Sequence, residues 1–134
     1  PDFRDGGRLP DWTSDYFEGR APKLTFDRLP AGTKSVVLVM EDPDAAAPKP
    51  FVHWLGQFSP DGTVKVRGSN SRGQLTYFGP RPPVGDPAHR YHFTALALSE
   101  DVAMPEGFTR AAMVRAVEGK VIGQATIVGL YEKK

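Results

Sequence analysis

The chain has 134 residues, and its 17 basic and 16 acidic side chains nearly cancel. Because no basic block stands out, we expect no nucleic-acid partner. The absence of cysteine excludes disulfides and thiolate metal sites. The longest apolar run, residues 36–40, is far too short to span a membrane, and from the polar N-terminus we expect no signal peptide. We therefore expect a single domain over residues 1–134 in the cytoplasm, with a periplasmic location left open.

The elements predicted first in the chain are extended. Residues 24–26 alternate between apolar and polar side chains and favour a short strand. Residues 29–33 contain proline and glycine and favour a turn. The apolar, β-branched run 35–41 predicts a strand that is covered on both faces. Pro43 ends this strand because proline cannot donate to a strand ladder.

The later elements are mostly strands separated by turns. Five of the seven residues in 79–85 are glycine or proline, so we expect residues 68–88 to form a long loop, which in a compact domain is usually functional. Thr109 is a suitable N-cap and Gly119 a suitable stop for one helix. The remaining predicted elements are strands at 51–58, 63–66, 90–98 and 121–131 and this helix at 109–118. The order predicts a mainly β fold with strands 35–41, 51–58, 90–98 and 121–131 at the centre of its sheet.

Three groups of polar side chains lie where predicted strands meet loops. The first is Asp42 and Asp44, which flank a rigid proline at a strand end, although aspartate also favours turns for ordinary reasons. The second is His53, which strand alternation places on one face with Phe51 and Leu55. A histidine on an apolar face is more often a core residue than a functional one, but a carboxylate from a neighbouring strand could fix its tautomer.

The third group lies in residues 89–93. Strand alternation places His89, Tyr91 and Phe93 on one face, where an N–H and an O–H could bind a phosphate or carboxylate oxygen. The preceding loop could turn its free N–H groups toward the same oxygen atoms. His92 is expected to point the other way, and Arg90 to hold a loop through carboxylate or carbonyl contacts.

Two other kinds of chemistry could use these residues. Two histidines and two aspartates could ligate zinc, but no short His-x-His or His-x-x-x-His pair supports this. A hydrolase could use Asp42 or Asp44 with His53, yet no G-x-S-x-G motif is present. Ser69 and Ser71 lie in a polar loop with no sign of activation. We therefore expect no metal, no cofactor and no catalysis.

Taken together, the chain resembles the phosphatidylethanolamine-binding protein (PEBP) family, in particular its bacterial and archaeal branch of Raf kinase inhibitor-like proteins. The matching segments are, in order, VLVMEDPDA at 37–45, VHW at 52–54, YFGPRPPVG at 77–85 and HRYHF at 89–93. Each segment alone is a weak signal, whereas four in order at compatible spacing are specific.

The resemblance implies a sandwich in which a large antiparallel sheet packs on a smaller one, with one helix in the C-terminal half. It also implies a shallow pocket for phosphate-like anions, including head groups of the phosphatidylethanolamine type. The implied pocket residues are Asp42, Asp44, His53, His89 and Tyr91. The implied loop wall consists of Tyr77, Gly79, Pro80, Arg81, Pro82 and Pro83.

Two departures from the family pattern bear on this pocket. Ala46 stands where the family usually has proline, so a rigid bend is either lost or moved to Pro48 or Pro50. Arg81 stands where the family often has a small residue. It could bind phosphate through a bidentate contact, or it could point outward as a solvated charge.

These features favour a non-enzymatic module that binds a phosphate-like anion or a phospholipid head group. In this interpretation His89, Tyr91 and loop N–H groups hold the anion, while Asp42 or Asp44 orients His53. The alternative is a protein that inhibits a kinase or a protease through the pocket rim, as eukaryotic relatives imply. A homodimer is left open.

Overall fold

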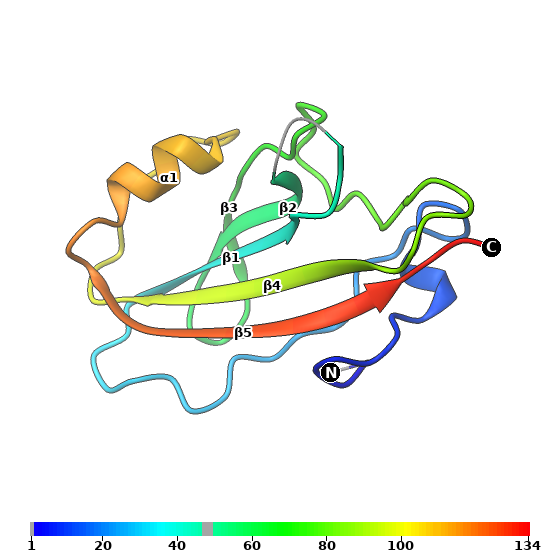
Figure 1. The fold of residues 1–134 in the computed structure, drawn as a ribbon. Helices are drawn as coiled ribbons and strands as arrows, with labels where there is room; N and C mark the ends of the chain where they lie inside the picture. Colours follow the sequence, from blue (N-terminus) through cyan, green and yellow to red (C-terminus); the bar gives the residue numbers. More distant parts are fainter. Residues whose placement is uncertain (1, 47–49) are drawn as a thin grey trace.

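The computed structural model describes residues 2–46 and 50–134, and this part of the chain forms five strands, one α-helix and one short 3-10 helix (Figure 1). Pro48, one of the two prolines to which a bend was assigned, lies outside the described residues. In chain order the elements are η1 (Asp11–Thr13), β1 (Ser35–Asp42), β2 (Phe51–Phe58), β3 (Val64–Arg67), β4 (His89–Leu98), α1 (Arg110–Ala116) and β5 (Val121–Tyr131).

The five strands form one antiparallel sheet in the order β3-β2-β1-β4-β5. The strands predicted from residue 35 onward are confirmed to within one residue at each end, but β5 lies at an edge of the sheet rather than at its centre. The outer side of its C-terminal end is paired with the N-terminal segment, where the Leu9 N–H donates to the Leu130 carbonyl at 2.8 Å. Arg8 and Leu130 form an isolated parallel bridge there.

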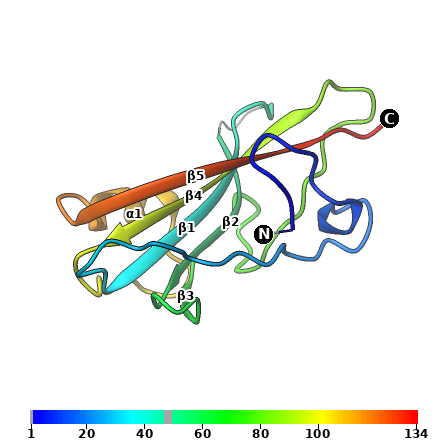
Figure 2. The same ribbon diagram turned by 90° about the horizontal axis from the view of Figure 1, so that it is seen from below.

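Strand β1 is the centre of the molecule because both of its faces are covered. Residues 36–40 are all buried, as the run of apolar residues predicts. Val37 and Val39 belong to a core shared with Phe108 and Met113, which lies under α1. Met40 belongs to a second core on the opposite face, together with Tyr91, Phe93, Tyr131, Phe3 and Leu9. Figure 2 shows α1 and the N-terminal segment on opposite sides of the sheet.

The second sheet that the resemblance implied does not form a ladder in the residues that are described. Instead the N-terminal segment runs in extended form along the sheet face opposite α1. Residues 24–26, predicted as a strand, belong to this segment. Their apolar side chains face inward, and Phe26 packs edge-on against Phe58 with ring centroids 5.7 Å apart. The alternation in this sequence therefore reflects packing on a sheet face rather than pairing at a sheet edge.

The predicted helix is confirmed as α1, although it ends two residues earlier than expected. The Thr109 side chain accepts a hydrogen bond from the Ala112 N–H at 3.1 Å, which is the capping contact that its position favours. Gly119 follows the helix with a φ of +77°, a conformation that glycine adopts without strain. No helix in the described part of the chain has the length and hydrophobicity needed to cross a membrane.

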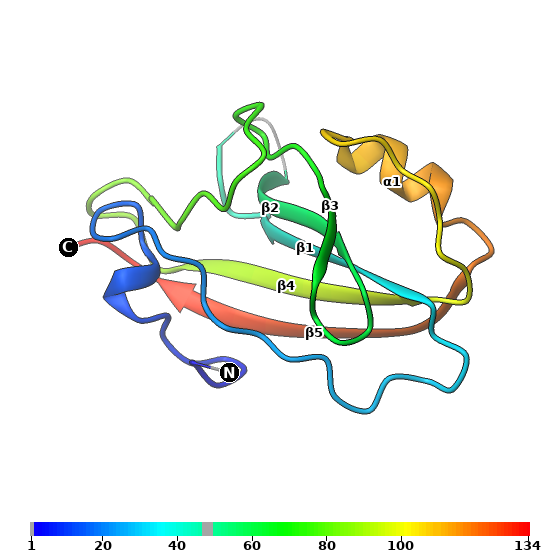
Figure 3. The same ribbon diagram turned by 180° about the vertical axis from the view of Figure 1, so that it is seen from behind.

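The long loop of residues 68–88 is confirmed as irregular, and it connects the edge strand β3 to the start of β4 (Figure 3). Backbone hydrogen bonds fix it at several points, which include Ser71 N–H to Val52 O at 2.8 Å and Phe78 N–H to His53 O at 2.9 Å. The Asp15 N–H also donates to Pro80 O at 3.0 Å. The loop is thereby held against the start of β2 and the N-terminal segment.

Candidate binding site

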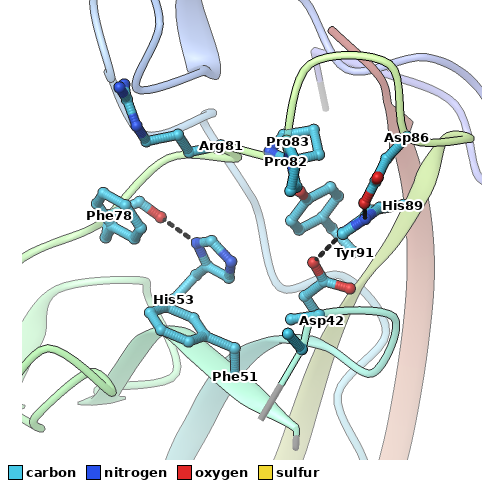
Figure 4. Close-up of a pocket in the computed structure, with 12 residues that line it drawn as sticks. Asp42, Phe51, His53, Phe78, Arg81, Pro82, Pro83, Asp86, His89 and Tyr91 are labelled. Carbon is cyan, nitrogen blue, oxygen red and sulfur yellow. Dashed lines mark hydrogen bonds and ion pairs between the residues drawn. The ribbon is translucent and has the colours of Figure 1, made fainter. Parts of the chain in front are cut away.

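A cavity of about 160 Å³ opens where β1 ends and where β2 and β4 begin (Figure 4). Four parts of the chain supply its wall: the end of β1 with the turn that follows, the start of β2, the Gly/Pro loop (residues 78–88, the last part of the long loop) and the start of β4. The lining residues are Asp42, Ala45, Ala46, Phe51, His53, Phe78, Arg81, Pro82, Pro83, Asp86, His89 and Tyr91. Drug-sized ligands occupy pockets of about 300–1,000 Å³, so this volume suits a small group such as a phosphate or an ethanolamine.

A β-bulge turns His53 into this cavity. Met40 pairs with Trp54 and Glu41 pairs with Val52, so His53 is the extra residue of β2. A bulge of this kind reorients a side chain and often lies next to a functional site. The prediction that His53 shares a face with Phe51 is confirmed, with ring centroids 4.8 Å apart. The prediction that it also shares a face with Leu55 is wrong, because the bulge sends Leu55 to the core under α1.

His53 is buried, and its Nδ1 lies 2.7 Å from the Phe78 carbonyl oxygen. Since a carbonyl only accepts, Nδ1 carries the proton and donates it. Burial lowers the pKa of His53 more strongly than the Phe78 carbonyl raises it. The ring is therefore neutral at pH 7, and its Nε2 lone pair is a hydrogen-bond acceptor. The prediction that Asp42 or Asp44 orients His53 is therefore wrong, because the partner that fixes the tautomer is the Phe78 carbonyl.

Asp42 instead holds His89. The His89 Nδ1 lies 2.6 Å from an Asp42 oxygen, and its Nε2 lies 3.0 Å from an Asp86 oxygen. Burial opposes the charged form of His89, but the hydrogen bonds with Asp42 and Asp86 outweigh it and raise the pKa. With a carboxylate at each nitrogen, the surroundings favour the imidazolium form of His89, which donates in both directions.

Tyr91 lies between the two histidines and is fully buried. Its ring meets His53 edge-on at 5.2 Å and lies nearly parallel to His89 at 6.3 Å. Its hydroxyl has no hydrogen-bond partner within the part of the chain that the structure describes. Burial raises the pKa of Tyr91 most, followed by the nearby Asp42 charge and by an interaction of the hydroxyl with the Asp42 side chain that does not meet hydrogen-bond geometry. The side chain therefore keeps its proton and presents an unused donor in the wall of the cavity.

Asp44 does not line the cavity, although it lies two residues from Asp42. The Arg90 backbone N–H and guanidinium both bind it, at 2.7 to 3.0 Å. The Arg90 side chain lowers the pKa of Asp44 to about 2. This confirms that Arg90 holds a loop through a carboxylate. Pro43 separates the two aspartates, so one turns into the cavity and the other turns outward to β4.

Arg81 contributes to the wall, but its charged end points away from the cavity (Figure 4). Its guanidinium lies 3.1 Å from an Asp15 oxygen and 4.5 Å from the centre of the Tyr16 ring. Of the two alternatives for Arg81, the structure shows the outward one. Pro82 and Pro83 line the cavity and have no N–H to offer a ligand.

Three predicted wall residues lie behind the cavity and support its loop. Tyr77 donates its hydroxyl to the Thr13 carbonyl at 2.9 Å and packs edge-on against Trp54. The Pro80 carbonyl accepts from the Ser14 hydroxyl at 2.7 Å. Gly79 lies so close to the N-terminal segment that an added Cβ would be 2.2 Å from the Thr13 oxygen. These residues fix the position of the loop.

Sequence reasoning missed five lining residues, which are Ala45, Ala46, Phe51, Phe78 and Asp86. The signal for Phe51 was available, because it lies on the strand face assigned to His53. Asp86 was detectable only from its position three residues before His89. The expectation that loop N–H groups form an anion nest meets two obstacles. Four residues of the loop 68–88 are prolines, and the N–H groups of Gly85 and Asp86 donate to backbone carbonyls.

Comparison with known proteins decides the family. Residues 1–132 match the family model described as phosphatidylethanolamine-binding protein. The chain belongs to the PEBP family. It is 34% identical to the UPF0098 protein of Methanothermobacter thermautotrophicus over 98% of this chain and 95% of that relative. It is 35% identical to LppC of Mycobacterium tuberculosis, a lipoprotein by name, over 98% of this chain and 70% of that relative.

Two solved structures have the same fold as this PEBP-family chain. A PEBP homologue from Chlamydia trachomatis, CT736, superimposes with a TM-score of 0.90 at 34% identity, over 98% of this chain and 94% of that one. YbcL of E. coli superimposes with a TM-score of 0.88 over 99% and 95%, and at 24% identity it shows the shared fold alone. The resemblance to the bacterial and archaeal branch and the mainly β fold class are thus confirmed.

Proposed function

We propose that this PEBP-family chain binds a phosphate-like anion or a phosphorylated head group in the cavity beside His89, without catalysing a reaction. The observation that carries the proposal is the Tyr91 hydroxyl, which is buried without a partner among the described residues. Leaving a buried donor unpaired costs about 1–3 kcal/mol. A ligand oxygen in the cavity would supply the missing acceptor.

The charges around the cavity favour a ligand that carries both signs. The His89 imidazolium and the Tyr91 hydroxyl are donors that suit phosphate oxygens. Asp42 and the Nε2 of neutral His53 are acceptors that suit an ammonium group. A phosphoethanolamine group offers both a phosphate and an ammonium, so we take a head group of the phosphatidylethanolamine type as the best candidate.

The carboxylates considered for hydrolysis are already engaged, which supports binding over catalysis. Asp42 accepts from His89 and from the Asp44 N–H, and Asp44 is held by Arg90. In the long loop, the Ser69 hydroxyl donates to the Gly107 carbonyl, and the Ser71 hydroxyl accepts from the Val52 N–H. A general base must reach the proton that it removes, and neither aspartate is free to do so.

The compartment stays a prediction. A cytoplasmic location was expected from the sequence, but LppC, a relative with a lipoprotein name, makes an exported location the second candidate. Fractionation of source cells with an antibody against this chain would decide between them, because an exported chain would be recovered outside the cytoplasmic fraction.

Titration with phosphoethanolamine, followed by NMR chemical shifts, tests the proposed function. We expect the signals of His53, His89 and Tyr91 to move together. Removing a charged hydrogen-bond partner costs about 1.5–3 kcal/mol, so His89→Ala should weaken binding at least about tenfold. The matched control is His92→Ala, a histidine of the same strand that faces the opposite side of the sheet, near Glu41 and Arg110. Affinity that is equal in His89→Ala and wild type would show that this cavity is not the site.

A further inference from the structure

The ring of His89 has no free donor in this structure, because each of its nitrogens faces a carboxylate. The two carboxylates differ in their surroundings. The side chain of Asp42 is 3% exposed and is held at 2.6 Å from Nδ1, deep in the wall. The side chain of Asp86 is 44% exposed and lies 3.0 Å from Nε2, at the rim. Of the two contacts, the one with Asp86 can open without exposing a buried charge.

The backbone around Asp86 is fixed independently of this contact. The Gly85 N–H donates to the Lys133 carbonyl at 2.8 Å, and the Asp86 N–H donates to the Pro83 carbonyl at 3.1 Å. Gly85 has a φ of +92°, which makes the sharp turn at the rim. Rotation about the side-chain bonds of Asp86 would therefore move its carboxylate away from His89 while the rim loop stays in place.

A carboxylate oxygen and a phosphate oxygen compete for the same kind of donor. Both accept short, charge-assisted hydrogen bonds from an imidazolium N–H. Asp86 and His89 both line the cavity (Figure 4), so the Asp86 oxygen occupies a position that a phosphoryl oxygen of a ligand would need. It also adds a negative charge that repels an incoming anion.

We propose that Asp86 is an internal competitor, whose carboxylate occupies the His89 donor until the phosphoryl oxygen of a ligand displaces it. This proposal rests on the proposed function, and it adds a residue that sets the strength of anion binding. Asp42 keeps His89 oriented and charged in both states. The folded chain therefore binds a phosphoryl group more weakly than the same cavity without Asp86 would.

The test compares wild type with Asp86→Ala and Asp86→Asn, each titrated with inorganic phosphate and with phosphoethanolamine. Glu118→Ala, which removes an exposed negative charge after α1, controls for net charge. At 0.15 M salt, charges farther apart than about 8 Å are largely screened. We expect both Asp86 variants to bind at least one of the two probes about tenfold more tightly and Glu118→Ala to bind both as wild type does. A gain for inorganic phosphate identifies free phosphate as a sufficient ligand, and a gain for phosphoethanolamine alone points to the head group.

The NMR titration of His89 gives a second measurement that needs no ligand. Loss of the Asp86 contact should lower the pKa of His89, because that carboxylate stabilises the charged ring. An unchanged His89 pKa in Asp86→Ala overturns the inference, and so does wild-type affinity of both Asp86 variants for both probes. If either of these results is found and His89→Ala still abolishes binding, the proposed function stands without the inference. Failure of both wild type and Asp86→Ala to bind either probe contradicts the two proposals together.

Discussion

The Tyr91 hydroxyl is the single residue feature with the clearest consequence. Because the hydroxyl has no hydrogen-bond partner among the described residues, Tyr91→Phe removes a buried donor without breaking a hydrogen bond. We expect the free energy of unfolding to stay within about 1 kcal/mol of wild type or to rise. Affinity for phosphoethanolamine should fall about tenfold. Urea denaturation and ligand titration of the same variant check both parts, and a loss of more than about 2 kcal/mol of stability would contradict them.

The pKa values of the two histidines beside Tyr91 are shifted in opposite directions from the usual value near 6.5. The pKa of His89 is raised, so its ion pairs contribute stability that is fully present below about pH 6.5. This stability is lost as the pH rises through the folded pKa of His89. The pKa of His53 is lowered, so its contribution is present above about pH 6.5 and is lost as the pH falls through its folded pKa.

We therefore expect an NMR titration of the folded chain to show His89 deprotonating at a higher pH than His53. Between the two values one ring is charged and the other is neutral. Phosphate binding should decline above this interval, as His89 loses its charge. The reverse order of the two titrations would refute the charge assignment on which the proposed function depends.

At the scale of elements, the Gly/Pro loop depends on its contact with the N-terminal segment. A side chain at Gly79 would meet the backbone of residues 13–15, so Gly79→Ala should cost about 3 kcal/mol or more of stability, at or above the upper end of typical overpacking. In the same loop, the side chain of Gly85→Ala would enter open space. This variant should therefore lose only about 1 kcal/mol of stability, which is the cost of a positive φ at alanine. Denaturant unfolding measures both variants. Equal costs would show that the loop is not held in this way.

The strands were predictable because most are rich in apolar or β-branched residues, and β1 and β3 end next to Pro43 and Gly68. The side-chain partners inside the site were harder to predict. Strict alternation could not reveal the bulge at His53, since a bulge depends on the register between two strands. The pairing of Asp42 with His89 depends on the register between β1 and β4. A single sequence does not specify these registers, so Asp42 was assigned to the wrong histidine.

At the scale of the whole molecule, the two faces of the sheet have different relations to the cavity. The core under α1 contains Met113, and the core on the opposite face contains Leu9 together with Tyr91. Both Met113→Ala and Leu9→Ala should cost about 2–5 kcal/mol of stability, because both side chains are buried. Only Leu9→Ala should also shift the NMR signals of Tyr91 and His89. Equal shifts in the two variants would show that the cores are not separate.

The cavity is assembled from segments that lie far apart in the chain, and this determines when it forms. Met40 and Phe93, which pair next to it, are about fifty positions apart, and such non-local contacts are slow to form during folding. A chain that has formed only its hairpins has no cavity. A ligand that needs all four segments therefore stabilises the complete fold by RT ln(1 + [L]/Kd) and leaves partly folded states unchanged. Bound ligand should slow unfolding while leaving the folding rate nearly constant, so that the head group extends the lifetime of the native state.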